Sequence, residues 1–187
     1  MTASIGAIVY PEGIYPDRMM TEIAHTLSAA GTRLAGVVQH NTCPPGRSRC
    51  DMLLEDLRTG AIIRISEDRG EQSRGCRINP QGLAEASASV AAALAGDLPE
   101  LLIINKFGKM EAEGDGLRDL IAQAIGQDVP VLIGVPQRNL DAWRAFAGSF
   151  ADELPPMQHA VRAWLQGRGL LPLEEARSAR LRAPALV

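Results

Sequence analysis

Four short and almost entirely apolar runs are the feature of this chain that most constrains its fold. They occupy residues 4–10, 33–39, 100–105 and 129–136, and segments with helical spacing of apolar residues separate most of them. A strand that is apolar along its whole length is buried on both faces, which is typical of parallel sheets whose crossover helices cover either side. The pattern therefore predicts an α/β domain built as three layers around a mostly parallel sheet.

The segments between and after these runs carry the end signals of helices. In residues 80–96, Asn79 is placed to cap the start, Pro80 stands at the first helical position and Gly96 follows the end. The other predicted helices cover residues 17–31, 114–127, 139–148 and 157–167. Asp17 is expected to cap the first of these.

Residues 50–66 depart from the alternation, because two strand-like runs are joined there by Arg-Thr-Gly. They predict an antiparallel hairpin inserted into the parallel sheet. No repeat or linker divides the chain, so we expect a single domain over residues 1–166 and a charged tail over 167–187. Only 4% of residues are aromatic, so the core must consist mainly of Ala, Leu, Ile and Val.

Composition argues against several classes of partner. A formal net charge of -3 does not favour a dedicated nucleic-acid surface. No apolar run approaches the length that crosses a bilayer, and the first residues lack the basic stretch of a signal peptide. We therefore predict a cytoplasmic protein without membrane insertion, in which Cys43, Cys50 and Cys76 are reduced thiols. The scattered histidines and the cysteine spacing predict no metal site.

The loop after the first apolar run, residues 11–16, is the first candidate site. A glycine-containing loop that leads from a strand into a helix can bind phosphate through free backbone N–H groups. Here only Gly13 is present, the lysine and hydroxyl of a phosphate-binding P-loop are missing, and Pro16 has no N–H to donate. An ordinary turn and an altered anion site that uses Gly13 both remain open.

The second candidate follows the apolar run that ends at Asn105. Residues 105–111 read Asn-Lys-Phe-Gly-Lys-Met-Glu. This stretch resembles the Walker-B segment of the thermophile-type nucleoside-triphosphatases, a branch of the P-loop NTPases, which have a pattern like Asp-Glu-Ile-Gly-Lys-Met-Glu. Asn105 stands where that family has the Asp that orients magnesium, and Lys106 stands where it has the acid that activates water. The resemblance implies a P-loop NTPase-like fold, while both changes remove a negative charge that phosphoryl transfer needs.

More of the chain resembles a bacterial domain family of uncharacterised function. The shared phrases include "GVVQ", "DMLLEDL-TG", "DRG--S-GCR" and "NKFGK-EAEG-GLRD", and they span most of the sequence. Members of that family are described as NTPases or linked with molybdenum transport. The resemblance implies a connection to molybdate transport proteins, with molybdate or tungstate as the ligand.

Two arginine-rich segments are the third candidate. Guanidinium groups and hydroxyls suit phosphate, sulfate, molybdate and tungstate, which make the same hydrogen-bonding demand. Together with the two lysines of the Walker-B-like segment, the predicted anion-binding residues are Arg47, Ser48, Arg49, Ser73, Arg74, Arg77, Lys106 and Lys109. The competing interpretation is that these arginines are solvated charges that balance nearby acids.

These motifs favour binding of a small phosphate-like oxyanion, without a catalytic residue or a further cofactor, in an accessory role in molybdenum metabolism. The alternative is a nucleoside-triphosphatase that uses Mg²⁺ and ATP or GTP, with Glu111 or Glu113 positioning water and metal. A third hypothesis is a module that binds another protein through an apolar helix face. A homo-oligomer that completes the site across a two-fold interface is also compatible with the exposed loops.

Overall fold

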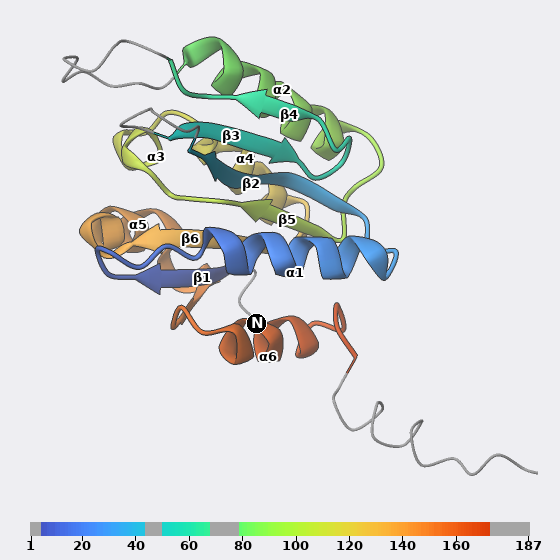
Figure 1. The fold of residues 1–187 in the computed structure, drawn as a ribbon. Coiled ribbons are helices and arrows are strands. Elements are labelled where there is room, and N and C mark those ends of the chain that lie inside the picture. The colour runs from blue at the N-terminus through green and yellow to red at the C-terminus, as the bar shows by residue number, and fades with distance from the viewer. Residues whose placement is uncertain (1–4, 44–49, 68–78, 173–187) are drawn as a thin grey trace, which may run out of the picture.

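A computed structural model describes residues 5–43, 50–67 and 79–172 of the chain. Its strands are β1 (Ile5–Tyr10), β2 (Leu34–Thr42), β3 (Asp51–Asp56), β4 (Ile62–Arg64), β5 (Leu101–Ile104), β6 (Val131–Pro136) and β7 (Ala151–Leu154). They form one sheet in the order β4-β3-β2-β5-β6-β1-β7 (Figure 1). β2, β5, β6, β1 and β7 run parallel, whereas β3 and β4 are antiparallel to their neighbours. The predicted parallel sheet with an antiparallel hairpin is thus confirmed.

Helices cover both faces of the sheet. They are α1 (Asp17–Ala29), α2 (Pro80–Ala95), α3 (Lys109–Glu113), α4 (Arg118–Gly126), α5 (Leu140–Ala147) and α6 (Gln158–Gln166), with 3₁₀ turns η1 (Gln137–Asn139) and η2 (Gly148–Phe150). The core divides into one cluster under α1 and α6 and a second under α2, α4 and α5. Figure 1 shows α1 lying across the near face of the sheet. The arrangement is the predicted three-layer α/β fold.

The central strand β5 shows why its sequence is apolar without interruption. Leu101 and Ile103 belong to the cluster under α1, while Leu102 and Ile104 belong to the cluster on the opposite face. All four side chains have no solvent exposure. Because successive side chains of a strand point to opposite faces, a strand covered on both sides needs apolar residues at every position.

Two glycines allow the strands around β5 to approach closely. Gly36 in β2 has a φ of +106°, and a Cβ there would collide with the carbonyl oxygen of Ile103. In β6, a Cβ at Gly134 would lie 2.5 Å from the carbonyl oxygen of Asn105. The missing side chains therefore help to position the end of β5, where the candidate site lies.

Of the two helix caps predicted at Asn79 and Asp17, the structure confirms the first and not the second. The Asn79 side chain accepts a hydrogen bond from the backbone N–H of Gln81 at 3.0 Å, which confirms the predicted cap of α2. The prediction that Asp17 caps α1 is wrong, because Pro16 holds that position and Asp17 is already within the first turn. The Asp17 carboxylate instead accepts a hydrogen bond from Asn105.

The cysteines require a correction. We expected reduced thiols, but the structure joins Cys43 and Cys50 by a disulfide, with the two Cα atoms 4.1 Å apart. The cause is the register between β2 and β3, which pairs Thr42 with Asp51 and so brings the residues just beyond them opposite each other. Sequence spacing alone did not indicate that β2 pairs with the hairpin. Cys76 lies outside the described residues.

The described chain ends in contact with the core. Leu171 is buried in the cluster under α1 and α6. Arg168 stacks on the ring of Trp164, with its guanidinium carbon 3.7 Å from the ring centroid. Among the described residues, no helix combines the length and apolar character needed to span a membrane.

Candidate functional site

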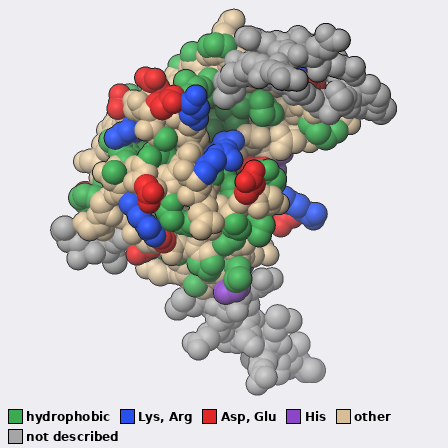
Figure 2. Space-filling model, turned by 90° about the vertical axis from the view of Figure 1, so that its left-hand side faces the viewer, with side chains coloured by type: hydrophobic (Ala, Val, Ile, Leu, Met, Phe, Trp, Pro, Cys, Tyr) green, Lys and Arg blue, Asp and Glu red, His purple; other side chains and the backbone are tan. Residues whose placement is uncertain are grey.

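Two adjoining pockets open at the end of the sheet where the parallel strands finish. The larger has a volume of about 260 Å³ and lies among β2, β3, β5 and α3. The smaller has a volume of about 60 Å³ and lies between the loop after β1 and the turn after β6. Figure 2 looks onto this end of the molecule and shows Lys and Arg side chains bordering hydrophobic ones. In open α/β sheets, this is where ligands bind.

Lys106 and Arg138 line both pockets and therefore mark the border between them. Lys106 follows β5 after one residue, and Arg138 lies in η1 directly after β6. Both side chains are exposed, and neither has an ion pair or hydrogen bond with another residue that the structure describes. Because β5 and β6 are neighbours, the topology itself brings these two cations to one place.

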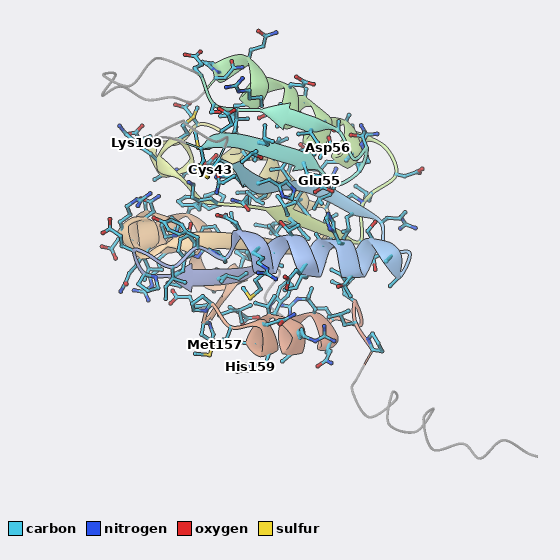
Figure 3. All side chains as sticks on the ribbon, viewed as in Figure 1. Cys43, Glu55, Asp56, Lys109, Met157 and His159 are labelled. Atoms are coloured by element: carbon cyan, nitrogen blue, oxygen red, sulfur yellow. A yellow bond between two sulfur atoms is a disulfide. The ribbon has the colours of Figure 1, made fainter. Side chains whose placement is uncertain are left out.

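Lys109, another predicted anion-binding residue, also lines the larger pocket. Its ammonium lies 3.6 Å from the Glu113 carboxylate one helical turn along α3. The Lys109 side chain is 85% exposed and projects outward from α3 (Figure 3). An exposed pair of this kind contributes little to stability, so the Lys109 charge remains accessible to a ligand.

Asn105 is buried at the end of β5 and uses both ends of its amide. Its oxygen accepts the backbone N–H of Gln39 at 3.1 Å, and its nitrogen donates to the Asp17 carboxylate at 2.9 Å. An Asp at position 105 would bring a second carboxylate within hydrogen-bond distance of Asp17, and the two charges would repel each other. The amide satisfies this contact without leaving a free acid for a cation.

Glu111 is buried and fixes the loop around α3. One carboxylate oxygen accepts the N–H of Gly108 at 2.8 Å and the other accepts the N–H of Leu117 at 3.1 Å. Gly116 has a φ of +65°, and a Cβ there would collide with the Glu111 carboxylate. Both oxygens are thus engaged by the backbone, and the side chain holds the segment in place.

The smaller pocket includes Tyr10, the last residue of β1. Burial raises the pKa of the Tyr10 hydroxyl above its usual range, Asp17 adds to the effect, and Arg138 opposes it. The group therefore keeps its proton and can donate a hydrogen bond to an anion. Gly13, in the loop between β1 and α1, has a φ of +86° and lines neither of these two pockets.

All six predicted residues of the two arginine-rich segments lie outside the described residues, namely Arg47, Ser48, Arg49, Ser73, Arg74 and Arg77. Within the described ranges, Lys106 and Lys109 share the larger pocket, and Glu111 lines it as well. Sequence reasoning missed Arg138 and Gln39. Each follows a run of buried strand residues, so the rule that sites lie at the carboxyl ends of parallel strands would have found them.

Metal binding can be tested against the donors present. In residues 5–43, 50–67 and 79–172, no group of three His, Cys, Asp or Glu side chains could hold a metal ion. Near the pockets, the Glu111 carboxylate is engaged by backbone N–H groups, and Asp17 accepts a hydrogen bond from Asn105. These two carboxylates are thus engaged in hydrogen bonds within the protein.

Residues 5–164 match a family model described as a protein of unknown function (DUF2478). The molybdenum import ATP-binding protein ModC 2 of Bradyrhizobium diazoefficiens is 38% identical over 160 residues, which is 86% of this chain and 18% of that protein. This chain therefore spans less than a fifth of that relative.

A solved structure shares the fold. The crystal structure of THEP1 from the hyperthermophile Aquifex aeolicus has a TM-score of 0.57 and 19% sequence identity, over 92% of this chain and 100% of that one. The likeness confirms the P-loop NTPase-like fold that the segment around Asn105 implied. At this identity it bears on the fold alone.

Proposed function

Since the chain belongs to the DUF2478 family, we propose that it binds a small phosphate-like oxyanion, with molybdate or tungstate favoured, in an accessory role in molybdenum metabolism. One observation carries the proposal. Lys106 and Arg138 meet at the border of two pockets, and neither has a partner among the described residues. Two cations that have no counter-ion among the described residues, at the ligand-binding end of an α/β sheet, attract an anion.

The surrounding groups support an anion over a cation. Asn105 and Lys106 occupy the two positions at which the resembling NTPases have acids, and the Tyr10 hydroxyl adds a donor. The Arg138 guanidinium can donate two parallel hydrogen bonds to one oxyanion, while Lys106 contributes a compact charge. The proposed site therefore consists of Lys106, Arg138 and Tyr10, with Lys109 at the rim of the larger pocket.

The molybdenum role rests on the relative's name. That protein is called a molybdenum import ATP-binding protein, and the alignment covers most of this chain. Tungstate has the same shape and charge as molybdate, so a site built from hydrogen-bond donors accepts both. The ATP-binding part of the name describes a protein of which this chain matches only 18%.

The alternative of ATP or GTP hydrolysis with Mg²⁺ receives less support from the geometry. The Glu111 carboxylate accepts hydrogen bonds from two backbone N–H groups around α3. Glu113 is exposed and lies near Lys109. A general base needs a free lone pair within reach of the proton that it removes, and a metal ligand needs one directed at the metal ion. Under the anion-binding proposal, purified protein with Mg²⁺ and ATP or GTP releases no phosphate above background.

Calorimetry tests the proposal directly. We expect saturable heat with molybdate and tungstate at submillimolar to millimolar concentrations, and weaker heat with sulfate and phosphate. Lys106→Met and Arg138→Met should each weaken molybdate binding by about tenfold, the loss expected when one charge-assisted contact disappears. Arg33→Met is the matched control, because Arg33 lines a separate pocket with Ser28 and Thr32.

Two results would overturn the proposal. The first is the absence of saturable heat for every one of the four anions at millimolar concentration. The second is molybdate binding that persists unchanged in both the Lys106→Met and Arg138→Met variants. Steady phosphate release from ATP would favour the enzyme instead.

A further inference from the structure

The larger pocket is too big and too apolar for an inorganic oxyanion alone. Its volume of about 260 Å³ is more than four times the volume of about 60 Å³ of the smaller pocket. A water molecule occupies about 30 Å³ of liquid, so the smaller space fits a group of a few atoms while the larger fits a ring system. The larger volume lies just below the about 300–1,000 Å³ typical of small-molecule sites.

The walls of the larger pocket are mainly hydrocarbon. Val37 and Leu54 come from neighbouring strands, Ile104 from β5, and the partly exposed Met52 and Met110 from β3 and α3. Open pockets lined in this way are poorly solvated by water and gain free energy when an apolar group replaces it. An inorganic anion in this space would lose hydration without gaining hydrogen bonds from these walls.

Two cations of the larger pocket lie at its border with the smaller pocket, and Lys109 stands at its rim. The polar side-chain atoms of Asn105 and Glu111 are engaged in hydrogen bonds within the protein. Lys106 and Arg138 are the cations shared with the smaller pocket. A single ligand that spans this border meets positive charge at one end and hydrocarbon at the other.

We propose that the site also binds an organic oxyanion: a phosphate-like group held by Lys106 and Arg138, attached to an apolar ring-sized body that fills the larger pocket. The inference rests on the proposed oxyanion site and deepens it by specifying the ligand class. The charged group sets the orientation, and burial of the body supplies additional affinity. Met52 and Met110, whose flexible thioethers adapt to irregular shapes, form part of the wall that contacts this body.

The test compares ligands that differ only in the organic body or in the charge. The probes are 1-naphthyl phosphate, inorganic phosphate and neutral 1-naphthol, titrated by calorimetry into the full chain. We expect the dissociation constant of 1-naphthyl phosphate to be at least about tenfold lower than that of phosphate, because the ring loses contact with water. It should also be at least about tenfold lower than that of 1-naphthol, which lacks the charge.

Variants place the body in the larger pocket. Met52→Gln and Met110→Gln keep the length of the side chain and make the wall polar. Each should reduce the affinity ratio between 1-naphthyl phosphate and phosphate by about threefold or more. Met157→Gln is the matched control, since Met157 is an exposed methionine that precedes α6 and does not line this pocket.

The outcomes separate this inference from the oxyanion proposal. Equal affinity for phosphate and 1-naphthyl phosphate overturns the inference and leaves the oxyanion site intact. A ratio that is unchanged in both Met52→Gln and Met110→Gln overturns the placement of the body. Equal binding of 1-naphthol and 1-naphthyl phosphate overturns the joint use of charge and hydrocarbon. If inorganic anions and 1-naphthyl phosphate all fail to bind, both proposals are wrong.

Discussion

At the end of β5, an amide and an ammonium stand side by side where the resembling NTPases have two carboxylates. The Asn105 amide links Gln39 in β2 to Asp17 in α1, and Lys106 lines both pockets together with Arg138. A buried carboxylate in place of Asn105 would lie within hydrogen-bond distance of the Asp17 carboxylate, and the two charges would repel each other. The amide therefore stabilises the fold locally, and the cation beside it supports the proposed anion site.

Glu111 offers a residue-scale test of structural against catalytic roles. Glu111→Gln should lower the free energy of unfolding by about 2 kcal/mol, because the buried carboxylate accepts two backbone N–H groups and an amide offers only one accepting oxygen. Urea denaturation monitored by circular dichroism measures the change. Glu113→Gln is the control and should stay within about 0.5 kcal/mol, since Glu113 is 60% exposed. Unchanged stability in Glu111→Gln would contradict the structural role.

Among the elements, the hairpin of β3 and β4 has one carboxylate that contacts both α1 and β2. Glu55 in β3 lies 2.9 Å from Nε2 of His25 in α1 and 2.7 Å from Nε2 of His40 in β2. Burial works to raise the pKa of Glu55, but hydrogen bonds from His40 and His25 outweigh it and leave that pKa below its usual value. Figure 3 shows Glu55 on β3, next to the buried Asp56 that begins the turn.

The interaction of Glu55 with His25 and His40 predicts that the stability of the protein depends on pH. A carboxyl whose pKa is lower in the folded state stabilises the protein above the unfolded pKa, and the contribution disappears as pH falls through the folded pKa. The difference in unfolding free energy between wild type and Glu55→Gln should therefore be largest near pH 6 and shrink from about pH 5 to about pH 3. Glu85→Gln, at an exposed position of α2, is the control. A difference that grows toward pH 3 would contradict the assignment.

The elements also show what sequence reasoning could and could not reach. The central strands and the Asn79-capped helix α2 were predictable, because burial on both faces and helix caps leave local signals. β7 (Ala-Asp-Glu-Leu) was missed, since a four-residue edge strand with exposed acids carries no apolar run. The short helix α3 is absent from the predicted helices, because its five residues are too few to show helical spacing of apolar residues. The strand-end rule indicates Arg138 as a candidate, but its place beside Lys106 depends on the neighbouring order of β5 and β6, which the sequence does not fix.

On the scale of the whole molecule, the two pockets, the altered Walker-B-like segment and the turn after β6 all lie at one end of the sheet. The central claim is that this end holds an oxyanion between Lys106 and Arg138. A crystal structure with tungstate tests the claim most directly, through the anomalous signal of the metal. We expect one strong peak with its oxygens about 2.7–3.2 Å from Lys106 Nζ and the Arg138 guanidinium. Tungstate bound only elsewhere, or no peak here at saturating concentration, would contradict it.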